Sequence, residues 1–447
     1  MLQTEEAEGR AAALIEAALR AGADAADVLY IGESATEVQV RLGELEDVTR
    51  SEGEEIGLRL FVGQRSASVS SSDLSADAMA ALVERAAAMA REAPEDPWAG
   101  LAPEERLLRG AAPDIEGDDR ADPSPVTLKE QALAIEEAAR AVPGITNSEG
   151  AGMSAGRTVV CLATSHGFAR AYAASGYSGS ASVIAGTGSG MQRDYASHST
   201  RHLENLDGPE AIGRLAGERA VRRLDPGKLP SGAMPVVFDP RVGSSLIGHL
   251  VGAITGPSIT RRSSFLLERL GQRILPEGIT IIDDPRRRRG LRSRPFDGEG
   301  LPTAQCNLID RGMLTGWLLD SASARQLGLE PTGHATRGGG SPGAGTTNVH
   351  LLPGTASVSD LMGDIARGLY VTELIGHGVN TVTGDYSRGA AGFLIENGSK
   401  GPAVAEITIA GNLIDMFARL AAADDLEFRY GINVPTLRID GMTIAGS

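Results

Sequence analysis

The segment from Phe238 to Gly256 constrains the fold more than any other part of the chain. Its sequence predicts one helix that begins after Asp239-Pro240 and ends at Gly256-Pro257, a typical stop signal. Almost no polar face is left on this helix, because its apolar residues are Leu246, Ile247, Leu250, Val251 and Ile254. A helix of this kind is stable only when other elements surround it. The chain must therefore build an enclosing domain.

The residues after Met234 can supply that enclosure, because short apolar runs alternate there with turn signals. Asn397-Gly398 and Asp440-Gly441 are strong hairpin turns. We expect a helix over 263–275 and strands over 279–282, 304–309, 313–319, 369–375, 392–396, 403–409 and 436–439. The predicted fold of residues 232–447 is a large, mostly antiparallel, barrel-like β domain with the apolar helix buried inside it.

The first half of the chain reads as two similar α+β units. The unit over 1–93 has predicted helices at 5–21 and from Ser75 to Pro94, and strands at 27–31, 37–42, 57–62 and 66–70. The unit over 126–228 has predicted helices at 127–142 and 209–224, and strands at 145–149, 158–163, 169–175 and 181–185. A proline-rich linker, 94–125, joins them. We therefore predict an α+β protein whose N-terminal half is a structural repeat.

Composition excludes several classes of function. The net charge is −16, which repels nucleic-acid phosphates, so direct nucleic-acid binding is not expected. The chain begins with an acidic segment and has no apolar run of about 18 residues, which predicts a cytoplasmic protein without a membrane span. Its two cysteines, Cys161 and Cys306, are far apart and predict neither a disulfide framework nor a paired-cysteine site.

His249 is the residue of the buried helix that needs a chemical explanation. The simplest interpretation is a core histidine hydrogen-bonded to a carbonyl group. As a metal ligand, His249 would need further ligands, and its own helix supplies none. Ser245 lies four residues earlier on the same helix face, which would suit a Ser–His dyad, but no orienting third residue or oxyanion-hole motif accompanies it.

Four stretches together resemble one known family. They are the helix at 238–256, the segment 296–303, the segment 383–398 and the segment 404–413. The chain resembles the TldD/PmbA metallopeptidases, also called modulators of DNA gyrase, whose catalytic branch carries His-Glu-x-x-x-His. On that motif His249 fits the last position, while Ser244 and Ser245 occupy those of the first His and the Glu. The resemblance also implies a zinc-binding cysteine near the C-terminus, and residues 424–435 contain none.

The resemblance implies a PmbA (TldE-like) subunit without metal or catalytic residues of its own. It would act with a TldD-type paralog that holds zinc, degrading unfolded peptides or maturing modified peptide precursors. The same fold would allow a homodimer. One alternative is an active metallopeptidase that combines His249 with donors among Cys306, His334, His350 and His377. Another is an adaptor for gyrase or another protein that takes no part in proteolysis.

Overall fold

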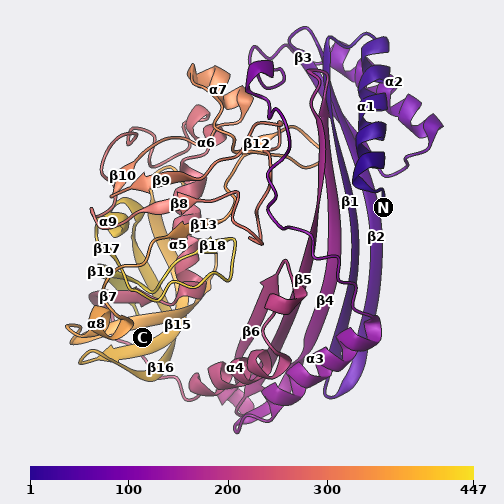
Figure 1. The fold of residues 1–447 in the computed structure, drawn as a ribbon. Coiled ribbons are helices and arrows are strands. Elements are labelled where there is room, and N and C mark those ends of the chain that lie inside the picture. The colour runs from indigo at the N-terminus through magenta and orange to yellow at the C-terminus, as the bar shows by residue number, and fades with distance from the viewer. Residues whose placement is uncertain (447) are drawn as a thin grey trace.

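The computed structural model describes residues 1–446. Its N-terminal half is built on one antiparallel six-stranded sheet with the strand order β3-β2-β1-β4-β5-β6 (Figure 1). The strands are β1 (Ala25–Arg41), β2 (Glu44–Val62), β3 (Arg65–Ser71), β4 (Ile145–Thr164), β5 (Ala169–Ala185) and β6 (Gln192–Thr200). The helices are α1 (Thr4–Arg20), α2 (Ala76–Glu92), α3 (Pro125–Arg140) and α4 (Pro209–Arg222).

The element order repeats, as expected, but each unit has three strands rather than the four predicted. The runs 27–31 and 37–42 belong to the single strand β1, which pairs with β2 and β4 along almost its whole length. Likewise the runs 145–149 and 158–163 belong to the single strand β4, and the runs 169–175 and 181–185 belong to β5. Pairing along both sides of these strands therefore joins runs that the local pattern separates. The strand β6 was not predicted, and α3 begins earlier than expected because Ser124 caps it.

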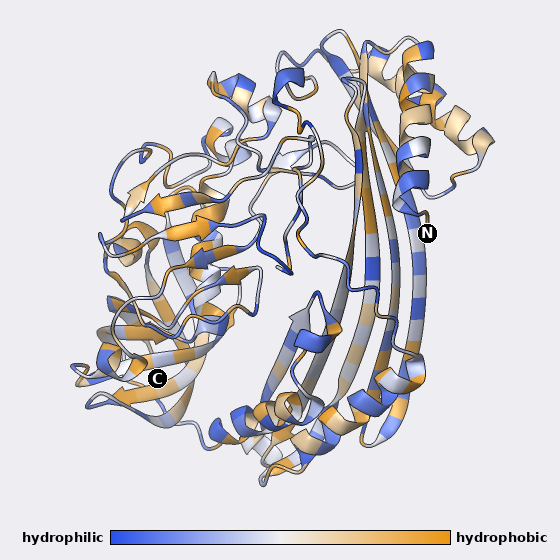
Figure 2. Cartoon of the chain, viewed as in Figure 1, coloured by the Kyte–Doolittle hydropathy of each residue, from blue (hydrophilic) through white to orange (hydrophobic). Residues whose placement is uncertain are grey.

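The two faces of this sheet have different partners. Along β1, Val28 and Tyr30 pack with α1 and α2, whereas Leu29 lies in a separate cluster with Phe296 and Leu301 of the C-terminal half. This is the alternation that a strand imposes on successive side chains. Figure 2 shows it as hydrophilic and hydrophobic bands along the long strands. The four helices cover one face, and the C-terminal domain lies on the other (Figure 1).

Residues 94–124 run between the sheet and the C-terminal domain and contact both. The Leu108 amide donates to the Gly300 carbonyl at 2.8 Å, and the Ser175 amide donates to the Gly117 carbonyl at 2.9 Å. Arg157 of β4 forms a two-point hydrogen bond with Asp118, with Nε–Oδ1 and Nη2–Oδ2 distances of 3.1 and 2.9 Å. This segment is thus held along its length as an ordered crossover.

The C-terminal domain is organised around a closed ring of five strands, which confirms the barrel-like, mostly antiparallel prediction. The ring order is β16-β15-β14-β7-β19, and β19 pairs back onto β16. Its strands are β7 (Gly232–Phe238), β14 (Arg367–Ile375), β15 (Asp385–Glu396), β16 (Ser399–Asn412) and β19 (Leu437–Ala445), with β17 (Leu420–Ala422) paired onto β19. A second sheet contains β8 (Ile281–Asp283), β9 (Cys306–Asp310), β10 (Met313–Leu314), β13 (Val349–Leu351) and β18 (Ile432–Asn433).

The remaining elements are short. The helices are α5 (Pro240–Ala253), α6 (Gly256–Thr260), α7 (Ser321–Leu327), α8 (Val358–Met362) and α9 (Leu413–Ala418), and β11 (Ala335–Thr336) pairs with β12 (Gly343–Ala344). The predicted helix over 263–275 is wrong. Most of its apolar residues enter the core, although Leu270 is exposed. Several of its amides bond outside the segment, as that of Phe265 does to the Thr381 carbonyl at 2.8 Å. Within residues 1–446 no helix combines the length and apolar character needed to cross a membrane.

A buried ionic cluster joins the two halves of the molecule. Asp27 of β1 accepts from Arg59 Nε of β2 at 3.0 Å and lies 2.6 Å from Arg337 Nη2, just after β11. The side chains of Asp27, Arg59 and Arg337 are 3%, 8% and 1% exposed. Burial alone would raise the pKa of Asp27, but the two guanidinium groups hold that pKa below its usual value. The carboxylate therefore stays charged and stabilises both cations.

We predict that Asp27→Asn lowers the free energy of unfolding by about 3–5 kcal/mol, because it leaves two buried guanidinium groups uncompensated. Urea unfolding followed by circular dichroism measures this. The control is Glu52→Gln, which removes a pair with Arg50 whose side chains are 56% and 71% exposed and should cost less than about 1 kcal/mol. Equal effects of the two substitutions would contradict the role given to Asp27.

Candidate functional site

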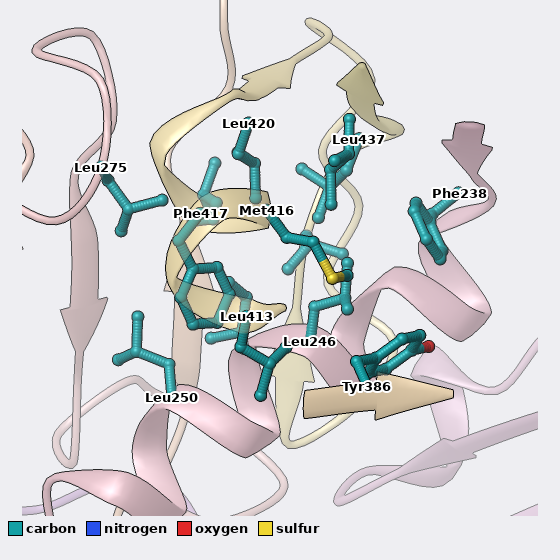
Figure 3. Packing of buried hydrophobic residues seen from close by; sticks show 14 of the residues in the cluster. Phe238, Leu246, Leu250, Leu275, Tyr386, Leu413, Met416, Phe417, Leu420 and Leu437 are labelled. Atoms are coloured by element: carbon teal, nitrogen blue, oxygen red, sulfur yellow. The ribbon is translucent and has the colours of Figure 1, made fainter. Parts of the chain in front are cut away.

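Helix α5 carries the degenerate motif and is held by caps at its start. Asp239 accepts a hydrogen bond from the Arg241 amide at 3.1 Å, and Pro240 occupies the first helical position. The buried residues of the helix are Gly243, Leu246, Ile247, Leu250 and Ala253. Figure 3 shows Leu246 and Leu250 among side chains from the ring and from α9. The predicted buried helix is thus confirmed, with one face only half-buried.

That half-buried face holds Ser244, Ser245, Gly248 and His249. The Ser245 hydroxyl donates to the Val242 carbonyl of its own helix at 2.7 Å, and Ser244 Oγ lies 3.5 Å from the Arg241 carbonyl. Both hydroxyls are therefore turned back onto the helix. Among the described residues, no hydrogen bond joins Ser245 and His249. These two residues therefore do not form a Ser–His dyad.

His249 is not the hydrogen-bonded core histidine that we expected. Its Nε2 is buried and, among residues 1–446, has no hydrogen-bond partner. The nearest aromatic ring is that of Tyr386 on β15, 6.2 Å away between ring centroids, and the Tyr386 hydroxyl is also buried without a described partner. Burial lowers the pKa of His249, and the nearby Arg388 guanidinium lowers it further. The imidazole is thus kept neutral.

The C-terminal segment 424–435 contacts α5. An active site with ligands from this segment and from α5 would require such a contact. A side chain added at Gly248 would lie 3.8 Å from Ile432 Cδ1, and one added at Gly243 would lie 3.2 Å from Val434 Cγ2. The fold therefore brings the C-terminal segment against α5, and the side chains of that segment that approach these two glycines, Ile432 and Val434, are apolar and cannot bind a metal.

Zinc is the metal that the resemblance implies for the catalytic branch, and the residues here do not fit it. His249 supplies one nitrogen, Ser244 and Ser245 supply only hydroxyls, and burial raises the pKa of Tyr386 to about 12. Structural and catalytic zinc sites use at least three nitrogen, sulfur or carboxylate ligands. No group of three His, Cys, Asp or Glu side chains suited to a metal occurs among the described residues.

The other donors considered from the sequence do not converge on His249. His377 is exposed in the turn after β14, and His350 lies edge-on to Phe428 with ring centroids 5.1 Å apart. His334 and Cys306 do contact each other, with a 3.6 Å separation between Nε2 and Sγ, but they belong to the second sheet and the loop beside it.

A cavity of about 300 Å³ lies between the half-buried face of α5 and the end of the N-terminal sheet. It is lined by Arg193, Asp194, Tyr195, Arg223, Arg241, Val242, Ser245, Thr372, Glu373, Leu374 and Arg388. Arg241 makes a two-point hydrogen bond with Asp194, with nitrogen–oxygen distances of 2.7 and 3.0 Å, and Arg223 contacts both Asp194 and Glu373. These pairs fix α5 against β6.

Sequence reasoning found the three motif positions but missed Tyr386, Arg388 and the Arg241–Asp194 pair. Tyr386 and Arg388 lie within the segment 383–398, which carried the family resemblance, so that segment was the available signal. No local pattern indicated that Asp194 lies beside α5, because Asp194 and Arg241 are 47 positions apart in the sequence.

The neutral state of His249 predicts a pH effect on stability. In the unfolded chain this histidine takes up a proton near its ordinary pKa of 6.5, whereas in the folded chain its pKa is lower. The folded state therefore loses stability as the pH falls below about 6.5. We predict that His249→Leu reduces this loss. The free energy of unfolding should therefore fall less in the variant than in the wild type between pH 7 and pH 5.

Urea unfolding at both pH values tests this prediction, with His377→Leu as the control at an exposed position. If the difference between His249→Leu and wild type is the same at pH 5 and pH 7, the imidazole is not held in its neutral form.

Comparison with known proteins identifies the family. Profiles of the PmbA/TldA metallopeptidase family match in order: domain 1 over residues 26–90, the central domain over 118–224 and the C-terminal domain over 231–446. The metalloprotease PmbA of Escherichia coli is 41% identical over 425 residues, which cover 95% of this chain and 92% of that protein. The PmbA homolog of Haemophilus influenzae is 38% identical over 100% of this chain and 98% of its own length.

Solved structures agree with the fold. A proposed modulator of DNA gyrase from Bacteroides thetaiotaomicron is 27% identical and superposes with a TM-score of 0.92 over 100% of both chains. TldE from Thermococcus kodakarensis is 23% identical, with a TM-score of 0.87 over 98% of this chain and 100% of that one, and shows the shared fold alone. The profiles and the PmbA relatives together confirm the resemblance drawn from the sequence: this chain belongs to the PmbA/TldD metallopeptidase family.

Proposed function

We propose that this chain is a metal-free, non-catalytic subunit of a cytoplasmic peptidase complex, and that a TldD-type paralog supplies the zinc site. The observation that carries the proposal is the donor set around α5. Two hydroxyls occupy the positions of the missing His and Glu, and apolar Ile432 and Val434 pack against the helix. A hydroxyl is a poor zinc ligand and cannot replace the carboxylate as a general base.

The proposed contribution of this chain is the wall of a chamber that admits extended peptides. In the described sheet, β6 pairs only with β5 and is an edge strand that borders the cavity at α5. At Tyr195 the amide already donates to Asp194 and the carbonyl accepts from Arg219, so an added peptide would pair with other positions of this edge. An extended peptide can add to such an edge through backbone hydrogen bonds that accept any side chain. This mode suits unfolded peptides and the leaders of modified peptide precursors. The net charge of −16 argues against direct binding to nucleic acid.

The partner in this proposal is a homologous chain. Two related folds can assemble through like surfaces about a pseudo-twofold axis, and a stable pair should bury at least about 2,000 Å² in total. The same surfaces would let this chain form a homodimer that does not cleave peptides.

We predict that the purified chain holds no stoichiometric zinc and shows no chelator-sensitive peptidase activity. Elemental analysis after purification without chelator, together with cleavage of an unstructured fluorogenic peptide, measures both. His249→Ala and His377→Ala serve as matched variants, since only the first removes the nitrogen in the motif. One tightly held zinc per chain that is lost in His249→Ala would instead establish an active metallopeptidase with an unusual ligand set.

A further inference from the structure

Cys306 belongs to a cluster of three reactive side chains outside the degenerate motif. It lies on β9 directly opposite Asp283 of β8, so both side chains are on one face of the second sheet. His334, in the loop before β11, covers that face. Its Nε2 lies 3.6 Å from Cys306 Sγ and 3.5 Å from Asp283 Oδ2.

The contacts of Asp283 fix the proton on His334. Asp283 is fully buried and accepts hydrogen bonds from the Thr347 amide at 2.9 Å and from the Thr347 hydroxyl at 2.5 Å. A carboxylate only accepts hydrogen bonds, and the His334 nitrogen that faces it therefore carries a hydrogen. Because Cys306 Sγ contacts the same nitrogen, the sulfur is the acceptor and the imidazole is the donor.

The charge of His334 strengthens this arrangement. Burial alone would lower the pKa of His334, but its contacts with Asp283 and Cys306 raise that pKa to about 9. Its Nδ1 also has a partner, the Thr332 hydroxyl at 2.9 Å. An imidazolium beside a thiol favours the thiolate, which is the nucleophilic form of cysteine.

We propose that Cys306 is a reactive thiol, activated by His334, and that it is a site of modification by small electrophiles such as hydrogen peroxide. Cys306 is half-buried rather than fully buried. Cys161 provides the contrast within the chain: it is fully buried, and burial raises its pKa to about 12. The remaining sulfurs of the chain are thioethers, so reactivity toward thiol reagents is assigned without ambiguity.

The proposed oxidation balances with peroxide as the named oxidant. The Cys306 thiolate attacks one oxygen of hydrogen peroxide, a sulfur–oxygen bond forms and the oxygen–oxygen bond breaks. The leaving hydroxide takes the proton from the imidazolium of His334 and becomes water. The sulfur is oxidised to a sulfenic acid, and peroxide is reduced to water.

The test is the rate of modification of each cysteine in the native full-length chain, with chelator present to remove adventitious metal. Iodoacetamide labelling followed by mass spectrometry should modify Cys306 and leave Cys161 unmodified. An ordinary thiol should label roughly a hundredfold faster at pH 8 than at pH 6. For a thiol activated by His334, the rate at Cys306 should change by less than about threefold over this range.

His334→Gln should lower the labelling rate of Cys306 at pH 7 about tenfold, with His350→Gln as the matched control in the same domain. After peroxide treatment, dimedone should add to Cys306 in the wild type and not in Cys306→Ser. If Cys306 labels only after denaturation, or if its rate rises with pH like that of an ordinary thiol, the proposal is wrong. The wild-type pH profile decides this even where His334→Gln does not fold.

Discussion

The enclosure of α5 is the constraint on which the C-terminal domain depends. Its apolar residues belong to the largest core cluster, together with residues of the ring, the second sheet and α9. Glycines allow neighbouring side chains to approach the backbone closely near both ends of the segment 238–256. Gly243 packs on Leu437, and a side chain at Gly256 would collide with Ser323. The face with Ser244, Ser245 and His249 is only half-buried, and Ser245 lines the cavity.

This packing shows why the fold does not depend on the residues at the motif positions. The residues that hold α5 in place are apolar, together with the Arg241–Asp194 pair, and none of them is a position of the degenerate motif. Replacing a metal ligand by serine therefore leaves the core intact. The same reasoning connects the buried Asp27 cluster to function, because it holds the C-terminal domain against the sheet whose β6 edge borders the cavity.

Local signals in the sequence predicted those parts of the fold that local forces decide. The start of α5, the hairpin at Asn397-Gly398 and the closed β-rich domain follow from capping, turn chemistry and alternation. The expected stop signal Gly256-Pro257 instead opens α6, because α5 has already ended at Ala253. The continuity of the long strands β1 and β4 could not be predicted from local signals, since it depends on partners more than 100 residues away in the sequence. The helix predicted over 263–275 does not form for a related reason. Its apolar spacing suits a helix, but some of its amides bond to distant carbonyls, such as that of Thr381, and others bond only within short turns.

The candidate site divides in the same way. The motif positions could be identified from spacing on one helix, whereas Tyr386, the Arg241–Asp194 pair and the cluster of Asp283, Cys306 and His334 required three-dimensional proximity. Sequence also suggested a hydrogen bond for His249, and the structure instead leaves Nε2 without a described partner. Whether a polar atom is satisfied depends on neighbours that no local pattern specifies.

The central claim is that this fold contributes to peptide cleavage only through a catalytic relative. The most direct measurement mixes this chain with its TldD-type paralog and follows cleavage of an unstructured peptide, with size-exclusion chromatography and light scattering on the same samples. We expect a mixed species and a large increase in the rate of cleavage. The increase should remain when this chain carries His249→Leu. A paralog that is fully active alone, with no mixed species at micromolar concentrations, would contradict the account and favour the adaptor function.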